Sequence, residues 1–211
     1  YAFAIPIGSA LGMLIGGVLT NLIGWRLTFI VVGVLGLAIA PLFKMTVKEP
    51  KRGRYDSPSA DLMAVSFSSV IKTLKTKKSF WFLTLGGASA SMMTYGLLFW
   101  FPSFLVRSFG SELITFFSWL PSFMHSSDSS PVLYVSYFYG AILLIGGIGG
   151  IWLGAVVSDK LGETDKSIYG RAPAYSFIGT VPFFLIGILS NSLTVVFFAF
   201  MIIQALSFVM M

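Results

Sequence analysis

Six long apolar stretches, separated by shorter polar segments, dominate the sequence. They cover residues 1–23, 27–47, 80–106, 132–157, 172–189 and 193–211, and none of them contains Asp or Glu. Each is close to the roughly 20 apolar residues that a helix needs to cross the hydrocarbon core of a bilayer. None shows the alternation of polar and apolar residues that marks the strands of a membrane barrel. The pattern therefore predicts an all-α integral membrane protein.

The composition agrees with a chain surrounded by lipid. The sequence is 56% hydrophobic and 10% charged, whereas a soluble domain carries about 25% charged residues. It has no Cys, a single His (His125) and no glycine loop leading to Lys-Ser/Thr. These observations argue against an enzyme, an ATP-driven pump, a metal site or a bound cofactor, and we expect His125 to be an ordinary solvated loop residue.

The basic residues predict the orientation of the six spans. Nine lie in or beside the connection of residues 48–79, three lie between residues 158 and 171, and only Arg26 and Arg107 lie on the opposite side. By the positive-inside rule, we expect residues 48–79 and 158–171 to be cytoplasmic. The expected location is the cell (inner) membrane, as a multi-pass protein. The basic run lacks interleaved aromatic residues, so we expect no nucleic-acid partner.

Two polar regions carry predictions of their own. In residues 48–79, the apolar spacing over 61–74 predicts a helix on the inner membrane face, capped by Ser59, in a linker between two helical bundles. Residues 111–124 are aromatic but interrupted by Pro121, and we expect them to form an interfacial helix on the outer side. The segment 155–162, with Asp159 and Lys160, is interpreted as a tight charged turn between two spans.

Three motifs resemble the major facilitator superfamily of secondary transporters. They are the glycine-rich run of residues 8–17, the sequence Gly24-Trp25-Arg26 with Phe29, and residues 155–162, which resemble the turn after the family's eighth helix. Asp159, Lys160 and Gly162 match that turn, whereas Ala155 and Glu163 depart from it. In the first motif, Met13 replaces the family's proline, which weakens any inference of antiport.

Within the superfamily, residues 95–107 and 5–9 resemble the Spinster-like branch, whose members transport sphingosine phosphate and lysolipids. The likeness of residues 95–107 is strongest to the bacterial members of that branch. The resemblance implies that the chain holds helices five to ten of a twelve-helix protein. Residues 1–47 would then be the last two helices of the N-terminal bundle, and residues 80–211 the first four of the C-terminal bundle. It also implies a monomer that alternates access by rocking the bundles.

Candidate functional residues follow from these motifs. A substrate pathway is predicted at Ser91, Tyr95, Phe99, Trp100, Tyr139 and Gln204; the alternative for each is packing or lipid contact. A conformational latch is predicted at Asp159, Lys160, Gly162 and Arg171; the alternative is solvated charges at a turn. Gly8, Gly12, Gly16 and Gly17 are predicted to allow close helix packing, either static or moving.

The expected function is secondary active transport of a lipid-like amphiphile across the bilayer. The alternatives are transport of a small polar solute, such as a sugar acid or organic anion, and a membrane receptor that transports nothing. Protons are the candidate coupling ion. Intramembrane carboxylates are the usual proton carriers, and the six spans contain none, so mutation of the acidic residues other than Asp159 should leave coupling intact.

Overall fold

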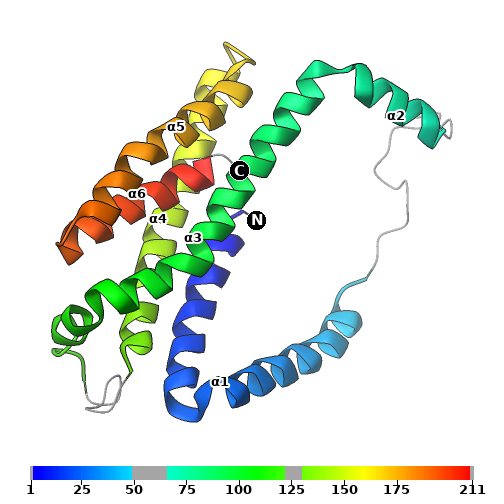
Figure 1. Cartoon of the computed structure of the whole chain (residues 1–211). Coiled ribbons are helices and arrows are strands. Elements are labelled where there is room, and N and C mark those ends of the chain that lie inside the picture. The colour runs from blue at the N-terminus through cyan, green and yellow to red at the C-terminus, as the bar shows by residue number, and fades with distance from the viewer. Residues whose placement is uncertain (1, 49–65, 122–129, 210–211) are drawn as a thin grey trace. The chain divides into compact units, whose positions relative to one another are not determined.

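The computed structural model describes residues 2–48, 66–121 and 130–209, and every regular element among them is a helix. The helices are α1 (Ala4–Thr46), α2 (Phe67–Thr76), α3 (Lys78–Phe116), α4 (Pro131–Gly162), α5 (Ile168–Leu189) and α6 (Leu193–Val209) (Figure 1). They form two compact units, one of Tyr1–Thr28 with Met92–Met211 and one of Phe29–Ser91. The predicted all-α class is confirmed.

Four of the helices, α1, α3, α4 and α5, are long and apolar enough to cross a membrane, and α6 is a shorter apolar helix. Helix α1 has 43 residues, a length of about 64 Å at 1.5 Å per residue, which is twice the thickness of a bilayer core. It therefore accounts for two of the predicted spans. α3, with 39 residues, is also longer than one crossing requires.

Helix α1 is broken at Gly24, where the sequence predicted the end of the first span. Gly24 has φ 77° and ψ 160°, a backbone conformation open essentially to glycine alone. One turn later, the Thr28 hydroxyl donates a hydrogen bond to the Gly24 carbonyl at 2.9 Å. The break divides α1 into two helices at the place where the sequence predicted a short turn, and Gly24 is the residue that leaves the helical conformation.

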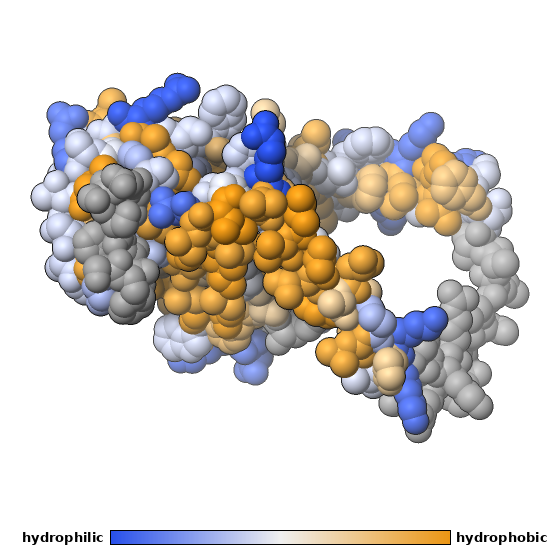
Figure 2. Space-filling view, turned by 90° about the horizontal axis from the view of Figure 1, so that it is seen from below, coloured by the Kyte–Doolittle hydropathy of each residue, from blue (hydrophilic) through white to orange (hydrophobic). Residues whose placement is uncertain are grey.

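The first unit is built around an aromatic and aliphatic core. Phe101, Leu105, Phe109 and Leu113 recur every four residues along α3, so they share one face, and all four are buried. This face packs with buried residues of α4 and α6, including Tyr139 and Ile203, and α6 packs on both α4 and α5. Large apolar side chains also remain exposed (Figure 2), which suits helices whose outer surface contacts lipid.

The second unit comprises the later part of α1, the helix α2 and the start of α3. α2 places Phe67, Val70, Ile71 and Leu74 on one face by their spacing, and Lys72 and Lys75 elsewhere. This is the described part of the helix predicted over residues 61–74. The predicted cap, Ser59, and the preceding residues lie outside the described part of the chain.

Two predictions of local structure were wrong. Residues 111–116 are not a separate interfacial helix but the last turns of α3, because Leu113 continues the buried face of that helix; residues 122–124 lie outside the described ranges. Residues 155–162 are likewise not a turn but the end of α4. Ala, Leu and Lys all favour helix, and the chain turns only at residues 163–167, after Gly162.

Candidate substrate pathway and helix seams

A stack of aromatic rings lies in the middle of the first unit. Tyr139, on α4, is only 3% exposed, and its ring packs edge-to-face on Phe101 of α3, with centroids 5.0 Å apart. Phe101 in turn stacks on Phe200 of α6 at 3.8 Å. Tyr139 was predicted to line the pathway, whereas Phe101 and Phe200 were missed. Their only signal in the sequence was the position of Phe101 next to Trp100.

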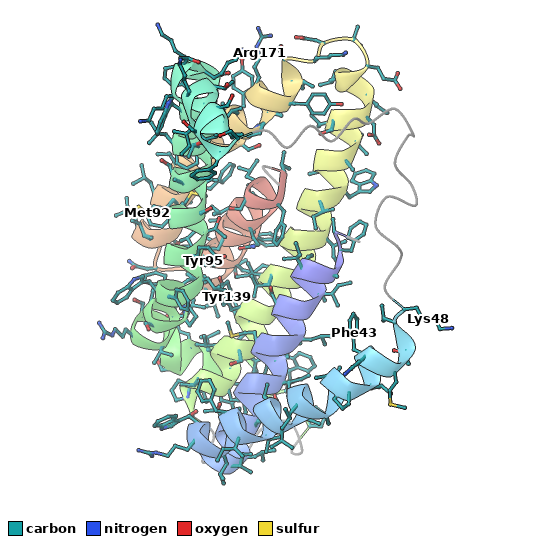
Figure 3. All side chains as sticks on the ribbon, turned by 90° about the vertical axis from the view of Figure 1, so that its right-hand side faces the viewer. Phe43, Lys48, Met92, Tyr95, Tyr139 and Arg171 are labelled. Atoms are coloured by element: carbon teal, nitrogen blue, oxygen red, sulfur yellow. The ribbon has the colours of Figure 1, made fainter. Side chains whose placement is uncertain are left out.

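The other aromatic residues predicted on α3 are exposed. Tyr95, Phe99 and Trp100 expose 60%, 70% and 74% of their surface, and Ser91 is exposed as well. Figure 3 shows Tyr95 on α3 and Tyr139 on α4 at a similar height in the helices. The described part of the first unit therefore leaves Tyr95 and Phe99 uncovered, while Tyr139 is enclosed.

Trp100 borders an apolar cavity of about 370 Å³ between α3, α5 and α6. Its wall includes Met92, Met93, Phe101 and Phe200, so the ring that packs on Tyr139 also faces this cavity. The Thr180 hydroxyl of α5 reaches Met93 Sδ at 3.5 Å. Flexible methionines and flat aromatic rings can accommodate an alkyl chain without demanding one fixed shape.

Helices α4 and α6 approach so closely that their backbones touch. Cβ atoms added at Gly146 and Gly150 of α4 would collide with the backbone of α6 at Met201 and Ala205, and one at Gly154 would lie 3.2 Å from the Val209 Cα. The glycines recur every four residues, as do the residues that they face. These glycines therefore allow the close packing of α4 on α6. Gln204, half-buried, lies at this seam beside Gly146.

A second seam joins α1 to α4 within the same unit. A Cβ at Gly17 would clash with Ser136, one at Gly147 would clash with Pro6, and one at Gly140 would lie 3.0 Å from Leu14 Cγ. At the end of the seam, the Ser130 N–H donates a hydrogen bond to Asn21 Oδ1 at 3.1 Å.

Of the four glycines predicted to pack, Gly17 alone lies in this seam. A methyl group added at Gly8, Gly12 or Gly16 would meet no described atom within 4 Å. The buried positions of α1 are instead Pro6, Ala10 and Gly17, before the kink, and Thr28. Gly8, Gly12 and Gly16 do share one face of α1, as their spacing of four predicted, but this face does not contact α4.

The predicted latch residues lie around the connection between α4 and α5. Asp159 and Lys160 are exposed in the last turns of α4, and Gly162 is buried beneath the tip of the Tyr169 side chain. Among the described residues, no ion pair involves Asp159. Arg171, which Figure 3 places near the start of α5, instead pairs with Asp165 at 3.3 Å.

Asp165 organises the start of α5, a role that was not predicted from the sequence. Its Oδ1 accepts a hydrogen bond from the Ser167 N–H at 2.8 Å, and its Oδ2 accepts one from the Ser167 hydroxyl at 2.6 Å. These hydrogen bonds, and then the Arg171 charge, lower the pKa of the Asp165 carboxyl. The signal available was Asp-X-Ser just before an apolar run, which is typical of a helix start.

The long apolar helices, with close glycine contacts between them, define a multi-pass helical membrane protein. The model of the Major Facilitator Superfamily matches residues 1–211. The chain belongs to this superfamily.

Curated relatives place the similarity within the Spinster group. The chain is 30% identical over 192 residues to protein spinster homolog 3 of Danio rerio, covering 90% of this chain and 37% of the relative. It is 28% identical over 185 residues to the sphingosine-1-phosphate transporter SPNS2 of Danio rerio, covering 87% and 35%. It is 29% identical to protein spinster of Drosophila melanogaster over 166 residues, covering 76% and 24%. The chain thus spans between about a quarter and somewhat more than a third of the length of these relatives.

Proposed function

We propose that the protein is a transporter, not an enzyme, and that it moves a single-chain, lipid-like amphiphile across the membrane by alternating access. Membership in the Major Facilitator Superfamily and the similarity to a relative named as a sphingosine-1-phosphate transporter support this class of substrate. The observation that carries it in this chain is the apolar cavity between α3, α5 and α6, bordered by Trp100 and Phe101. Its methionine and aromatic wall suits an alkyl chain better than a sugar.

The moving contact in this proposal is the seam between α1 and α4. Residues 1–47 would belong to the N-terminal bundle and residues 80–211 to the C-terminal bundle, so the seam would join the two bundles. Contacts as close as Gly17 with Ser136 and Gly147 with Pro6 have few intermediate arrangements. Tight packing of this kind favours two discrete states over a continuous slide.

The end of α4 would act on the cytoplasmic side, with residues 48–79 and 158–171 facing the cytoplasm of a cell-membrane protein. The Asp159 carboxylate is exposed there and can accept hydrogen bonds from another helix when that side closes. Arg171 forms an ion pair with Asp165, so we propose that Arg171 stabilises the connection between α4 and α5. Asp159 is then the residue that we propose as the conformational latch. The protein would act as a monomer, with protons as the candidate coupling ion.

A transport assay tests this function. The full-length protein, reconstituted into proteoliposomes, should take up a radiolabelled lysophospholipid and not a sugar acid of similar charge. Trp100→Ala and Phe200→Ala should each reduce lysophospholipid uptake, whereas Trp152→Ala, an exposed tryptophan of α4 outside this cavity, should not. Uptake of the sugar acid alone would establish the small-solute alternative. Saturable binding of the lysophospholipid without uptake would establish a receptor.

A further inference from the structure

Two pockets that differ in polarity adjoin at the end of the first unit where α3 ends, α4 begins and α5 connects to α6. The first, of about 630 Å³, is open, and its lining includes the exposed polar side chains of Glu112, Thr115, Asn191 and Ser192. The second, of about 360 Å³, is apolar and aromatic, with Phe117, Tyr137, Phe138, Phe197 and Phe198 in its wall. Phe116, Leu193 and Thr194 line both cavities, so the polar space and the apolar space share a wall.

The polar cavity favours a positively charged group. Glu112 is its single ionisable lining residue, and among the described residues no Lys or Arg pairs with that carboxylate. Helix α3 ends at Phe116, and α5 ends at Leu189, two residues before Asn191. The ends of both helices present partial negative charge. The start of α6 at Leu193 contributes partial positive charge. The Glu112 carboxylate and the two helix ends outweigh this contribution, so negative charge prevails around the cavity.

The size and ligands of this cavity indicate an organic cation rather than a metal ion. Ca²⁺ requires six to eight oxygen ligands, and its sites usually contain several carboxylates, whereas this cavity offers one. The pocket, of about 630 Å³, is open to its surroundings, which leaves room for an organic group larger than a metal ion. The hydroxyl and amide groups of Ser111, Asn191 and Ser192 can hydrogen-bond the polar atoms around a cationic centre.

We propose that this pair of cavities is a second binding site, for a single-chain amphiphile with a cationic head group. The ammonium group lies beside Glu112 in the polar cavity, and the chain enters the aromatic cavity past Thr194. The site lies on the predicted outer side of the membrane and shares no lining residue with the cavity that Trp100 borders. It depends on the proposed function only for the class of ligand, a single-chain amphiphile.

Photolabelling tests the site without measuring transport. The probe is dodecyltrimethylammonium carrying a photoreactive group on its chain, applied to the full-length protein in nanodiscs, with labelled peptides mapped by mass spectrometry. Label is expected in residues 111–121 and 190–198. Glu112→Gln should raise the half-saturating concentration about three- to fivefold, the upper range for an exposed charge pair. Glu112→Asp should retain most of the affinity, and Glu163→Gln, at the far end of α4, should change nothing.

Three results would overturn the proposal. The first is that Glu112→Gln leaves the labelling of these segments unchanged. The second is that the site binds dodecyl phosphate as tightly as dodecyltrimethylammonium. The third is that tetramethylammonium competes with the probe as effectively as dodecyltrimethylammonium does. The last would show that the aromatic cavity contributes nothing. If Glu112→Gln does not fold, Thr194→Val, which removes a hydroxyl from the shared wall at constant shape, should still weaken labelling. Labelling of these segments without lysophospholipid uptake would support the second site and contradict the transport proposal. Lysophospholipid uptake without such labelling would support the transport proposal and contradict the second site.

Discussion

Substitution of Gly17 tests the seam between α1 and α4 most simply. In Gly17→Ala, the new methyl group would overlap Ser136, which is buried and whose hydroxyl donates to the Val132 carbonyl at 2.8 Å. Overpacking of this kind costs about 1–3 kcal/mol, while alanine regains about 1 kcal/mol of helix propensity over glycine. The net loss in free energy of unfolding is therefore about 0–2 kcal/mol.

The matched control is Gly12→Ala on the same helix, where a methyl group meets nothing within 4 Å. This variant gains the helix propensity without the overlap. The two variants should then differ by about 1–3 kcal/mol in the free energy of unfolding, measured by denaturation in detergent micelles. In a two-state equilibrium such a difference changes the population of the packed state roughly 5- to 150-fold.

Removing the obstacle should restore the loss. In the double variant Gly17→Ala with Ser136→Gly, the methyl group has room, and a double-mutant cycle should show a favourable coupling between the two positions. The reasoning is refuted if Gly17→Ala and Gly12→Ala are equally stable, or if the cycle shows no coupling. Either result would mean that α1 does not pack on α4 through Gly17.

Three further predictions concern other parts of the chain. Gly24→Ala should lower the free energy of unfolding by about 1–3 kcal/mol because alanine is strained at φ 77° and ψ 160°; denaturation as for the wild type would contradict this. In an NMR pH titration, the pKa of the Asp165 carboxyl should lie below the usual value of about 3.9, and Ser167→Ala should raise it, since Ser167 is the main cause of the lowered pKa. Because the folded-state pKa is lowered, the contribution of this carboxyl to stability is present above about pH 4 and is lost as the pH falls through the folded-state pKa. An unshifted titration midpoint of Asp165 in Ser167→Ala would contradict the assignment. Glu112→Gln should leave the number of protons moved per substrate unchanged, as should Asp128→Asn, outside the described residues, and loss of proton-driven uptake in either would show that the coupling group lies in this chain.

The helices were predictable from the sequence because each depends on a local property. A run of about 20 apolar residues without Asp or Glu must satisfy its backbone internally in lipid, and this requirement holds whatever the neighbours are. The break at Gly24 was predictable for a similar reason, since glycine stands among polar and aromatic residues between two such runs. The end of α4 was not, because Asp159 and Lys160 suggested a turn although charged residues are compatible with a helix end.

The seams and the aromatic stack depend on which helix faces which, and periodicity alone does not decide that. Gly8, Gly12 and Gly16 form as regular a stripe as Gly146, Gly150 and Gly154, yet only the second stripe faces another helix within the described residues. Tyr95 and Tyr139 were both predicted to line the substrate pathway, Tyr139 as the weaker candidate, but the structure exposes Tyr95 and buries Tyr139. Partners of this kind come from distant parts of the chain.

The most direct test of the account is to lock the seam and measure transport. These 211 residues contain no cysteine. In a full-length protein whose cysteines outside them have been replaced, Asn21→Cys with Ser130→Cys introduces one defined pair, at positions joined by a 3.1 Å hydrogen bond. If the contact between α1 and α4 must open in each transport cycle, oxidation of this pair should abolish lysophospholipid uptake by the full-length protein, and reduction should restore it. Uptake at the same rate in the oxidised and the reduced protein would contradict the central claim.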